Sequence, residues 1–168
     1  MKHSTSPVSG FTLTEMLVVL AIAGILATIA IPGFKSLTQS QQVRNATFEL
    51  YASLIVARSE AIKRNDDVWV TPVTYTVTFP APEHDEYGWT IAASGVTIQN
   101  QPQLKGVDLR ADPNVSPWVT YRRTGRTTAT TSPVFKIDAY GETTPYMRCI
   151  KIELSGMPRI YKPVSGAC

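Results

Sequence analysis

The chain has 168 residues, which allows one ordinary domain with an appendage but not two substantial domains. Apolar residues make up 43% and charged residues 17%, so a packed core is expected. The net charge of +3 is too small to indicate nucleic-acid binding by itself. Two cysteines exclude a disulfide-rich mini-protein and a four-thiolate zinc site, and two histidines leave little room for histidine catalysis.

A long apolar segment lies near the N-terminus. From Met16 the sequence MLVVLAIAGILATIAI carries no charge and a single hydroxyl, that of Thr28. With Phe11 and Leu13, the expected helix reaches Ile31, close to the roughly 20 residues that cross a bilayer. The alternatives are a secretory signal peptide, a simple signal anchor and a buried core helix.

One acidic residue lies within this apolar segment. An unpaired Glu15 carboxylate inside a membrane would cost about 3 kcal/mol or more, so it must be neutralised or paired with a cation. The polar segment MKHSTSPVSG ends at Gly10, and a cut before Phe11 would create an α-ammonium about one helical turn from Glu15. In a bundle of staggered helices, that ammonium would reach the Glu15 of a neighbouring subunit.

The run SGFTLTEMLVVLAIAGILATIAIPGF resembles the class III signal of type IV pilins and type II secretion pseudopilins. In this resemblance Gly10 precedes the cut, Phe11 is the N-methylated new N-terminus, and Glu15 serves assembly. Pro32 corresponds to the proline that often follows the apolar segment.

The resemblance also implies processing and location. Prepilin peptidase would remove residues 1–10 as a leader, and residues 11–34 would form a transmembrane and filament-core helix. The protein would be a single-pass protein of the bacterial inner membrane with a periplasmic head, which later enters a pilus or pseudopilus. Lys2 is the one lysine or arginine on the cytoplasmic side, fewer than the positive-inside rule favours.

Pro32 and Gly33 predict a helix break or bend, because proline removes a backbone donor and glycine resists helical order. Apolar residues then recur every three or four positions, which predicts an amphipathic helix over 35–65 that packs on a sheet. The apolar stripe consists of Val43, Ala46, Leu50, Leu54, Ala57 and Ala61, widened by Phe48, Tyr51, Ile55 and Ile62.

From residue 66 to 168 the apolar period is two, which predicts a β-rich globular head. Pro72 predicts an edge strand or a broken strand. The expected fold class is α+β, with a long N-terminal helix whose outer half lies against an antiparallel head. The expected strands are 68–73, 74–79, 88–93, 96–100, 118–123, 134–139, 149–154 and 159–162.

A second resemblance covers most of the chain. LIVARSEAIKRNDDV, a Gly-Trp pair at 88–89 and a late SGMPRI are similar to the GspH/FimT group of minor pilins and pseudopilins. It implies a helix packed on two small sheets and a low-copy role in an initiating or tip complex. In members that serve DNA uptake a late Gly-Arg-x-Arg motif binds DNA; the corresponding residues are Gly156–Arg159, where Met157 replaces the first arginine.

Residues 110–168 hold nine Lys or Arg against four Asp or Glu. Two interpretations stay open: a solvated or subunit-facing basic patch, or phosphate-dominated DNA capture in natural transformation. Tyr121 or Tyr161 would add stacking in the second case. The DNA-binding residues would then be Arg122, Arg123, Arg126 and Arg159.

Cys149 opens an expected strand and Cys168 is the last residue, both outside the membrane in this topology. A disulfide between them would pin the tail and stabilise the head by about 3 kcal/mol on the chain-entropy model. Free or intermolecular thiols are the alternative. A similar C-terminal bridge is common in pilins, so the resemblance favours the disulfide.

We find no nucleophile elbow, phosphate loop or metal-spaced His/Cys set in the sequence, so we expect no enzyme, no cofactor and no metal site. The expected function is a minor pilin or pseudopilin of a type IV pilus or a type II secretion pseudopilus. Its partners would be prepilin peptidase, other pilins or pseudopilins, the inner membrane and, in the alternative, DNA. A secreted or anchored β domain with another ligand is the third hypothesis.

Overall fold

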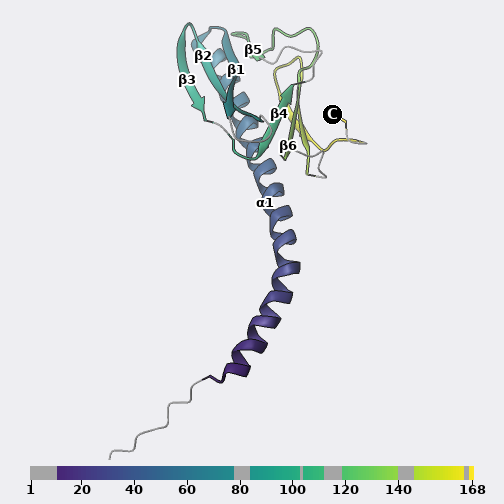
Figure 1. Cartoon of the computed structure of the whole chain (residues 1–168). Helices are drawn as coiled ribbons and strands as arrows, with labels where there is room; N and C mark the ends of the chain where they lie inside the picture. The colour runs from purple at the N-terminus through teal and green to yellow at the C-terminus, as the bar shows by residue number, and fades with distance from the viewer. Residues whose placement is uncertain (1–10, 78–83, 103, 112–118, 140–145, 165–166) are drawn as a thin grey trace, which may run out of the picture. The chain divides into compact units, whose positions relative to one another are not determined.

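The computed structural model describes residues 11–77, 84–102, 104–111, 119–139, 146–164 and 167–168 (Figure 1). The chain divides into two compact units, residues 1–38 and residues 39–168. Helix α1 (Leu13–Arg64) contributes to both units. The second unit, called the head below, also contains all eight strands of the described residues.

Helix α1 is continuous from Leu13 to Arg64, so of the break or bend predicted at Pro32 and Gly33 the break is wrong, and the bend stays a prediction. Proline costs about 3 kcal/mol inside a helix because it removes one backbone hydrogen bond. A long helix loses only that one bond. The hydroxyls of Thr28 and Ser36 each donate to a backbone carbonyl one turn earlier, at 2.7 and 2.9 Å, and add local hydrogen bonds around the proline.

Two antiparallel sheets of four strands form the rest of the head. The first has the order β3-β2-β1-β5, with bounds Val96–Gln101, His84–Ala93, Val68–Val77 and Val119–Tyr121. The second has the order β4-β6-β7-β8, with bounds Val107–Ala111, Val134–Ala139, Arg148–Ile152 and Pro158–Tyr161. The α+β class and the two small sheets are confirmed.

Strand β1 joins two segments that the sequence predicted as separate strands. Pro72 lies within it and pairs with Trp89 of β2. On the other side, β5 pairs only with Val68–Val70. Strand β1 is therefore internal in the order of the sheet, and among the described residues its pairing with β5 reaches from Val68 to Val70.

Strand β4 was not predicted from the sequence, although Val107 and Leu109 alternate with polar residues directly after Gly106. It pairs with β6 over its whole length.

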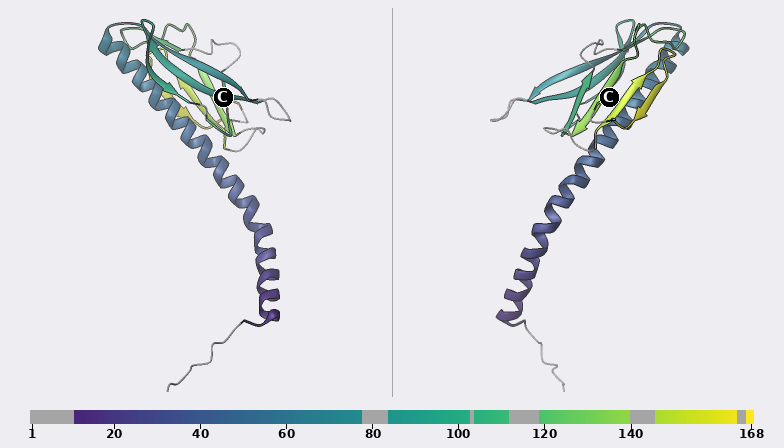
Figure 2. Two further views of the ribbon diagram at one scale, coloured as in Figure 1. Left: turned by 60° about the vertical axis from the view of Figure 1, so that its left-hand side comes forward. Right: turned by 90° about the vertical axis from the view of Figure 1, so that its right-hand side faces the viewer.

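A single core joins the helix to both sheets, which lie along the second half of α1 (Figure 2). All six residues of the predicted stripe are buried, with exposures of 0 to 3%. The predicted widening is wrong at Phe48 and Ile62, which are 58% and 49% exposed. The sheets contribute Val68, Val70, Trp89, Ile91, Ala93, Val107, Val119, Tyr121, Phe135, Ile137, Ala139, Ile150 and Ile152.

Candidate functional site

The first turn of α1 carries a reciprocal hydrogen-bonded cap. The backbone N–H and the hydroxyl of Thr12 both donate to Glu15 Oε2, at 2.9 and 2.8 Å. The Glu15 N–H in turn donates to the Thr12 hydroxyl at 3.2 Å. This is a capping box, in which a side chain at each end satisfies the other residue's backbone N–H. The predicted cleavage position, Gly10, lies outside the described residues, whereas Phe11 is described and exposed.

The apolar side chains of the first half of α1 are exposed. Phe11 and Leu13 are 81% and 77% exposed, and Ile31 and Phe34 are still near 70% (69% and 71%). Among the described residues, α1 is long and apolar enough to cross a membrane by length and composition. Exposed apolar surface of this extent requires a bilayer or other helices around it.

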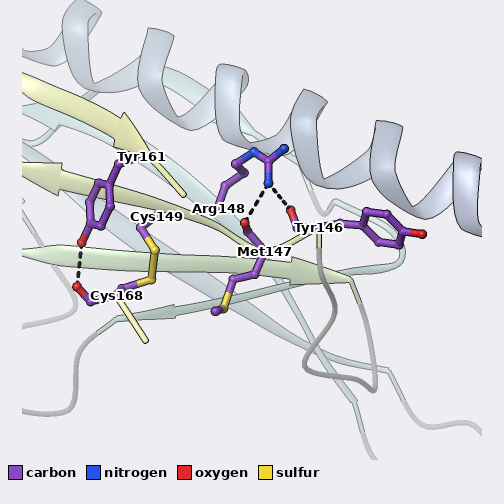
Figure 3. Close-up of a disulfide and its surroundings, with 6 residues drawn as sticks. All are labelled: Tyr146, Met147, Arg148, Cys149, Tyr161 and Cys168. Atoms are coloured by element: carbon purple, nitrogen blue, oxygen red, sulfur yellow. Dashed lines mark hydrogen bonds between the residues drawn. A yellow bond between two sulfur atoms is a disulfide. The ribbon is translucent and has the colours of Figure 1, made fainter. Parts of the chain in front are cut away.

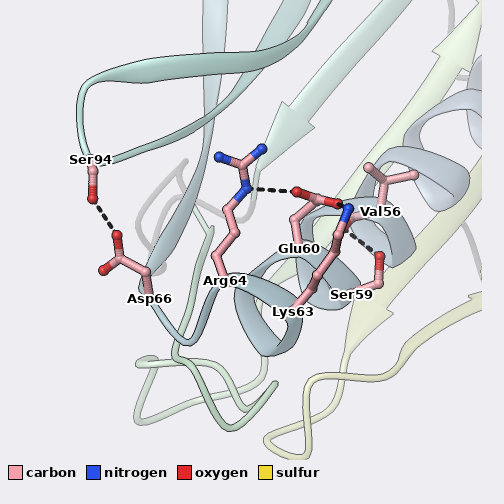
Figure 4. A network of polar contacts seen from close by, with 7 residues as sticks. All are labelled: Val56, Ser59, Glu60, Lys63, Arg64, Asp66 and Ser94. Carbon is pink, nitrogen blue, oxygen red and sulfur yellow. Dashed lines mark hydrogen bonds and ion pairs between the residues drawn. The ribbon is translucent and has the colours of Figure 1, made fainter.

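The end of α1 is fixed by polar contacts (Figure 4). Glu60 accepts from Arg64 at 2.6 Å and from Lys63 at 3.3 Å, and both bonds hold the pKa of the Glu60 carboxyl below its usual range. One turn on, the Ser94 hydroxyl donates to Asp66, whose other oxygen accepts from the Asp67 N–H at 2.8 Å. These bonds, Ser94 first, lower the pKa of Asp66.

Three of the predicted basic residues lie on one tight turn after β5. We call Arg122–Arg126 the arginine turn. The Arg122 N–H donates to the Arg126 carbonyl at 2.8 Å, and the Gly125 N–H donates to the Arg122 carbonyl at 2.7 Å. Gly125 has a φ of 75°, a conformation that favours glycine. The arginine turn and the residues directly after the end of α1 line one hollow, whose residues are Asn65, Asp66, Asp67, Arg122, Arg123, Thr124, Arg126, Thr127 and Thr128.

Arg58, a residue of α1, makes a hydrogen bond to the backbone of the arginine turn. Arg58 Nε donates to the Gly125 carbonyl at 3.0 Å. A turn of the second sheet also touches this carbonyl, because a Cβ placed on Gly156 would lie 1.9 Å from the Gly125 oxygen. The helix and the turns that follow β5 and β7 therefore meet at Gly125.

The fourth predicted basic residue lies in a different place. Arg159 is in β8 and lines a hollow with Lys151, Glu153 and Tyr161 rather than the hollow of the arginine turn. Tyr121 is fully buried, and burial raises the pKa of its hydroxyl well above the ordinary value, so the expected stacking by Tyr121 is wrong. The four-arginine DNA site is thus not assembled in one hollow.

The predicted disulfide is present. Cys149 and Cys168 are bonded, with their Cα atoms 5.7 Å apart (Figure 3). Cys149 is fully buried in β7, and the Tyr161 hydroxyl donates to the Cys168 carbonyl at 2.8 Å. The disulfide and this hydrogen bond therefore hold Cys168 to the second sheet.

Sequence reasoning missed the capping partner Thr12 and the anchor Arg58. The first had a signal, since Thr12-x-x-Glu15 before an apolar run matches the capping-box pattern. The second had none, because its partner Gly125 lies 67 residues further along the chain. Only the folded chain brings these two residues together.

An apolar N-terminal helix joined to a two-sheet head defines the fold of a pilin, and the comparisons with known proteins agree. The family model described as type II transport protein GspH matches residues 46–156, which is more than half of the chain. The chain therefore belongs to the GspH family of minor pilins and pseudopilins. The model of the prokaryotic N-terminal methylation motif matches residues 6–31.

Individual relatives support the same assignment. Two crystal structures of the type IV minor pilin FimU of Pseudomonas aeruginosa superpose with TM-scores of 0.57 and 0.52 at 21% identity. They cover 76% and 70% of this chain and 92% and 91% of FimU, and at this identity they show a shared fold. Two fimbrial proteins of Pseudomonas aeruginosa are 42% identical over 59 residues, 35% of this chain and 38% of each relative. The chain thus spans little more than a third of these curated relatives. None of these comparisons supports the DNA-binding alternative.

Proposed function

We propose that this protein is a minor subunit of a type IV pilus or of a type II secretion pseudopilus, placed in an initiating or tip complex. In this proposal prepilin peptidase cuts between Gly10 and Phe11 and methylates the Phe11 amine. Residues 11–34 first anchor the chain in the bacterial inner membrane, with the head in the periplasm, and then enter the filament core. The role is structural, without an enzymatic step, cofactor or metal.

One observation carries this proposal: the first half of α1 exposes its apolar side chains and bears a single carboxylate, Glu15, within its first turn. Bilayer and filament core are both apolar, so moving the helix between them keeps its side chains away from water. The new Phe11 ammonium of one subunit would pair with Glu15 of its neighbour, which offsets the cost of burying both charges.

Because Glu15 also belongs to the capping box, the assembly test uses variants that separate its charge from its hydrogen bonds. Glu15→Gln keeps an amide oxygen for the Thr12 donors but loses the charge, whereas Glu15→Ala loses both. If charge pairing drives assembly, both variants stay in the membrane and both are at least tenfold depleted in sheared filaments. Thr12→Val is the matched control, since it weakens the cap and leaves the charge.

Filament levels of Glu15→Gln equal to the wild type would contradict the pairing. Mass spectrometry of the membrane-bound protein tests the processing step independently. The expected N-terminus is a methylated Phe11, and a chain that still begins at Met1, or one cut near Ala30, would refute the proposal. A deletion strain scored for twitching and for exoprotein release would assign the chain to the pilus or to the secretion machine.

A further inference from the structure

The arginine turn presents three cations without internal partners. Arg122, Arg123 and Arg126 are exposed, and none of their guanidinium groups makes an ion pair or hydrogen bond with another described residue. All three line the hollow formed with the end of α1. Guanidinium groups bind carboxylates through two parallel hydrogen bonds, so this arrangement offers several strong anion contacts.

A buried hydroxyl in the same hollow also has no partner. Thr127 lines the hollow and is only 9% exposed, and its Oγ1 makes no hydrogen bond in the structure. Buried polar groups in proteins are nearly always hydrogen-bonded, so the Thr127 hydroxyl retains hydrogen-bonding capacity beside the three cations. The hydroxyl both donates and accepts, which suits a carboxylate or a peptide group.

The backbone of the site is fixed before any ligand arrives. The Thr128 N–H donates to the Thr120 carbonyl at 3.0 Å, and Tyr121 pairs with Thr127 in an isolated bridge. Arg58 holds Gly125 from the helix side. A pre-organised loop loses less conformational entropy on binding than a mobile one.

The charges around the hollow distinguish between two kinds of anion. Asp66 and Asp67 lie in the same lining as the three arginines, and both oxygens of Asp66 already accept hydrogen bonds. Nonspecific DNA binding depends on neutralising a series of phosphates, which offer no hydrogen-bond donor to the two aspartates. A peptide instead brings carboxylates for the arginines and backbone N–H groups for the aspartates.

We infer that the arginine turn is a docking site for an acidic peptide segment of another filament subunit, with Thr127 bonding to the docked chain. This inference rests on the proposed function, which supplies the neighbouring subunit. The inference places the contact between the two subunits in the hollow beside the arginine turn.

The test uses the full-length mature chain in detergent micelles and measures fluorescence anisotropy. The probes are a labelled Gly-Asp-Glu-Asp-Gly peptide, its Asn/Gln counterpart and a short DNA duplex. Changing Arg122, Arg123 and Arg126 together to Gln should weaken binding of the acidic peptide at least tenfold. The matched control changes three exposed cations elsewhere, Lys105, Arg159 and Lys162, to Gln and should leave binding within twofold.

Thr127→Val provides a second readout, because valine keeps the shape and removes the hydroxyl. It should weaken peptide binding about two- to fivefold while the thermal unfolding temperature stays the same or rises. A merely structural hydroxyl would change the unfolding temperature and not the binding.

Three results would overturn the inference: equal binding of the Asn/Gln peptide, equal weakening by the control variant, or tighter binding of DNA than of the acidic peptide. In cells, the triple arginine variant should be depleted in filaments although it is membrane-bound and correctly cut. Normal incorporation of this variant, together with loss of Glu15→Gln, would refute the docking site and leave the proposed function standing. Absence of the wild-type chain from filaments would refute the proposed function, whereas the peptide measurement would still decide the docking site.

Discussion

At the scale of single residues, two glycines with positive φ allow a controlled comparison. Gly156 has a φ of 87° and would place a Cβ 1.9 Å from the Gly125 oxygen. Gly95 has a φ of 78°, but a Cβ there would meet nothing within 4 Å. An alanine would therefore be both strained and obstructed in place of Gly156, but only strained in place of Gly95.

We predict that Gly95→Ala lowers the free energy of unfolding by about 1 kcal/mol, the cost of an alanine in the left-handed region. Gly156→Ala should lower it by about 3 kcal/mol or more, because the new methyl group must also displace the Gly125 carbonyl that Arg58 binds. Thermal unfolding of the full chain, followed by the fluorescence of buried Trp89, measures both losses. Equal losses would show that the contact at Gly125 carries no energy.

Residue-scale predictions from the sequence succeeded where the chemistry is local. The disulfide was expected because only two cysteines exist and one is at the end of the chain. Arg159 lines a different hollow from the arginine turn, which the sequence could not show, since which side chains share a hollow depends on strand order and register. The free hydroxyl of Thr127 has no sequence signal, because burial and a missing partner are properties of the folded head.

At the scale of elements, the end of α1 has a pH-dependent component. The hydrogen bonds from Ser94 and from the Asp67 N–H lower the pKa of Asp66 in the folded chain. A group whose pKa is lower folded than unfolded stabilises the fold above its unfolded pKa, and this contribution is lost as pH falls through the folded value. Acid should therefore loosen the junction between α1 and β1.

We predict that the unfolding temperature falls between pH 5 and pH 2, and that Asp66→Asn removes part of this fall. Asp67→Asn is the control, since among the described residues no group donates a hydrogen bond to the Asp67 carboxylate. Thermal unfolding of both variants across that range tests the assignment. If Asp67→Asn reduced the fall in unfolding temperature as much as Asp66→Asn, the pH dependence would not come from Asp66.

Helix and strands could be told apart in the sequence because their apolar residues recur with different periods. The stripe of α1 repeats every three or four residues, and all six of its members are buried as expected. The continuity of α1 across Pro32 was not predictable from local rules, because a long helix absorbs one lost hydrogen bond. The position of Pro72 inside β1 was also not predictable from local rules, because it depends on the pairing of that strand with β2.

At the scale of the whole molecule, the disulfide ties the C-terminal residue to β7, an internal strand of the second sheet. The sequence separation of 19 residues gives a loop whose closure is worth about 3 kcal/mol on the chain-entropy model. Cys149→Ala with Cys168→Ala should lower the free energy of unfolding by about that amount. A reductant should destabilise the wild type and leave the double variant unchanged, which thermal unfolding with and without reductant would show. Equal sensitivity of both proteins to the reductant would contradict the prediction.

The contact between Arg58 and Gly125 has a mechanical consequence. Tension applied to the arginine turn would pass through the 3.0 Å hydrogen bond between the Gly125 carbonyl and Arg58 Nε into the last two turns of α1. Within the described part of the chain, β5 pairs with β1 over three residues, so this hydrogen bond adds a second attachment for the turn that follows β5. In the assembly proposed above, a pull on the arginine turn would therefore reach α1 as well as the first sheet.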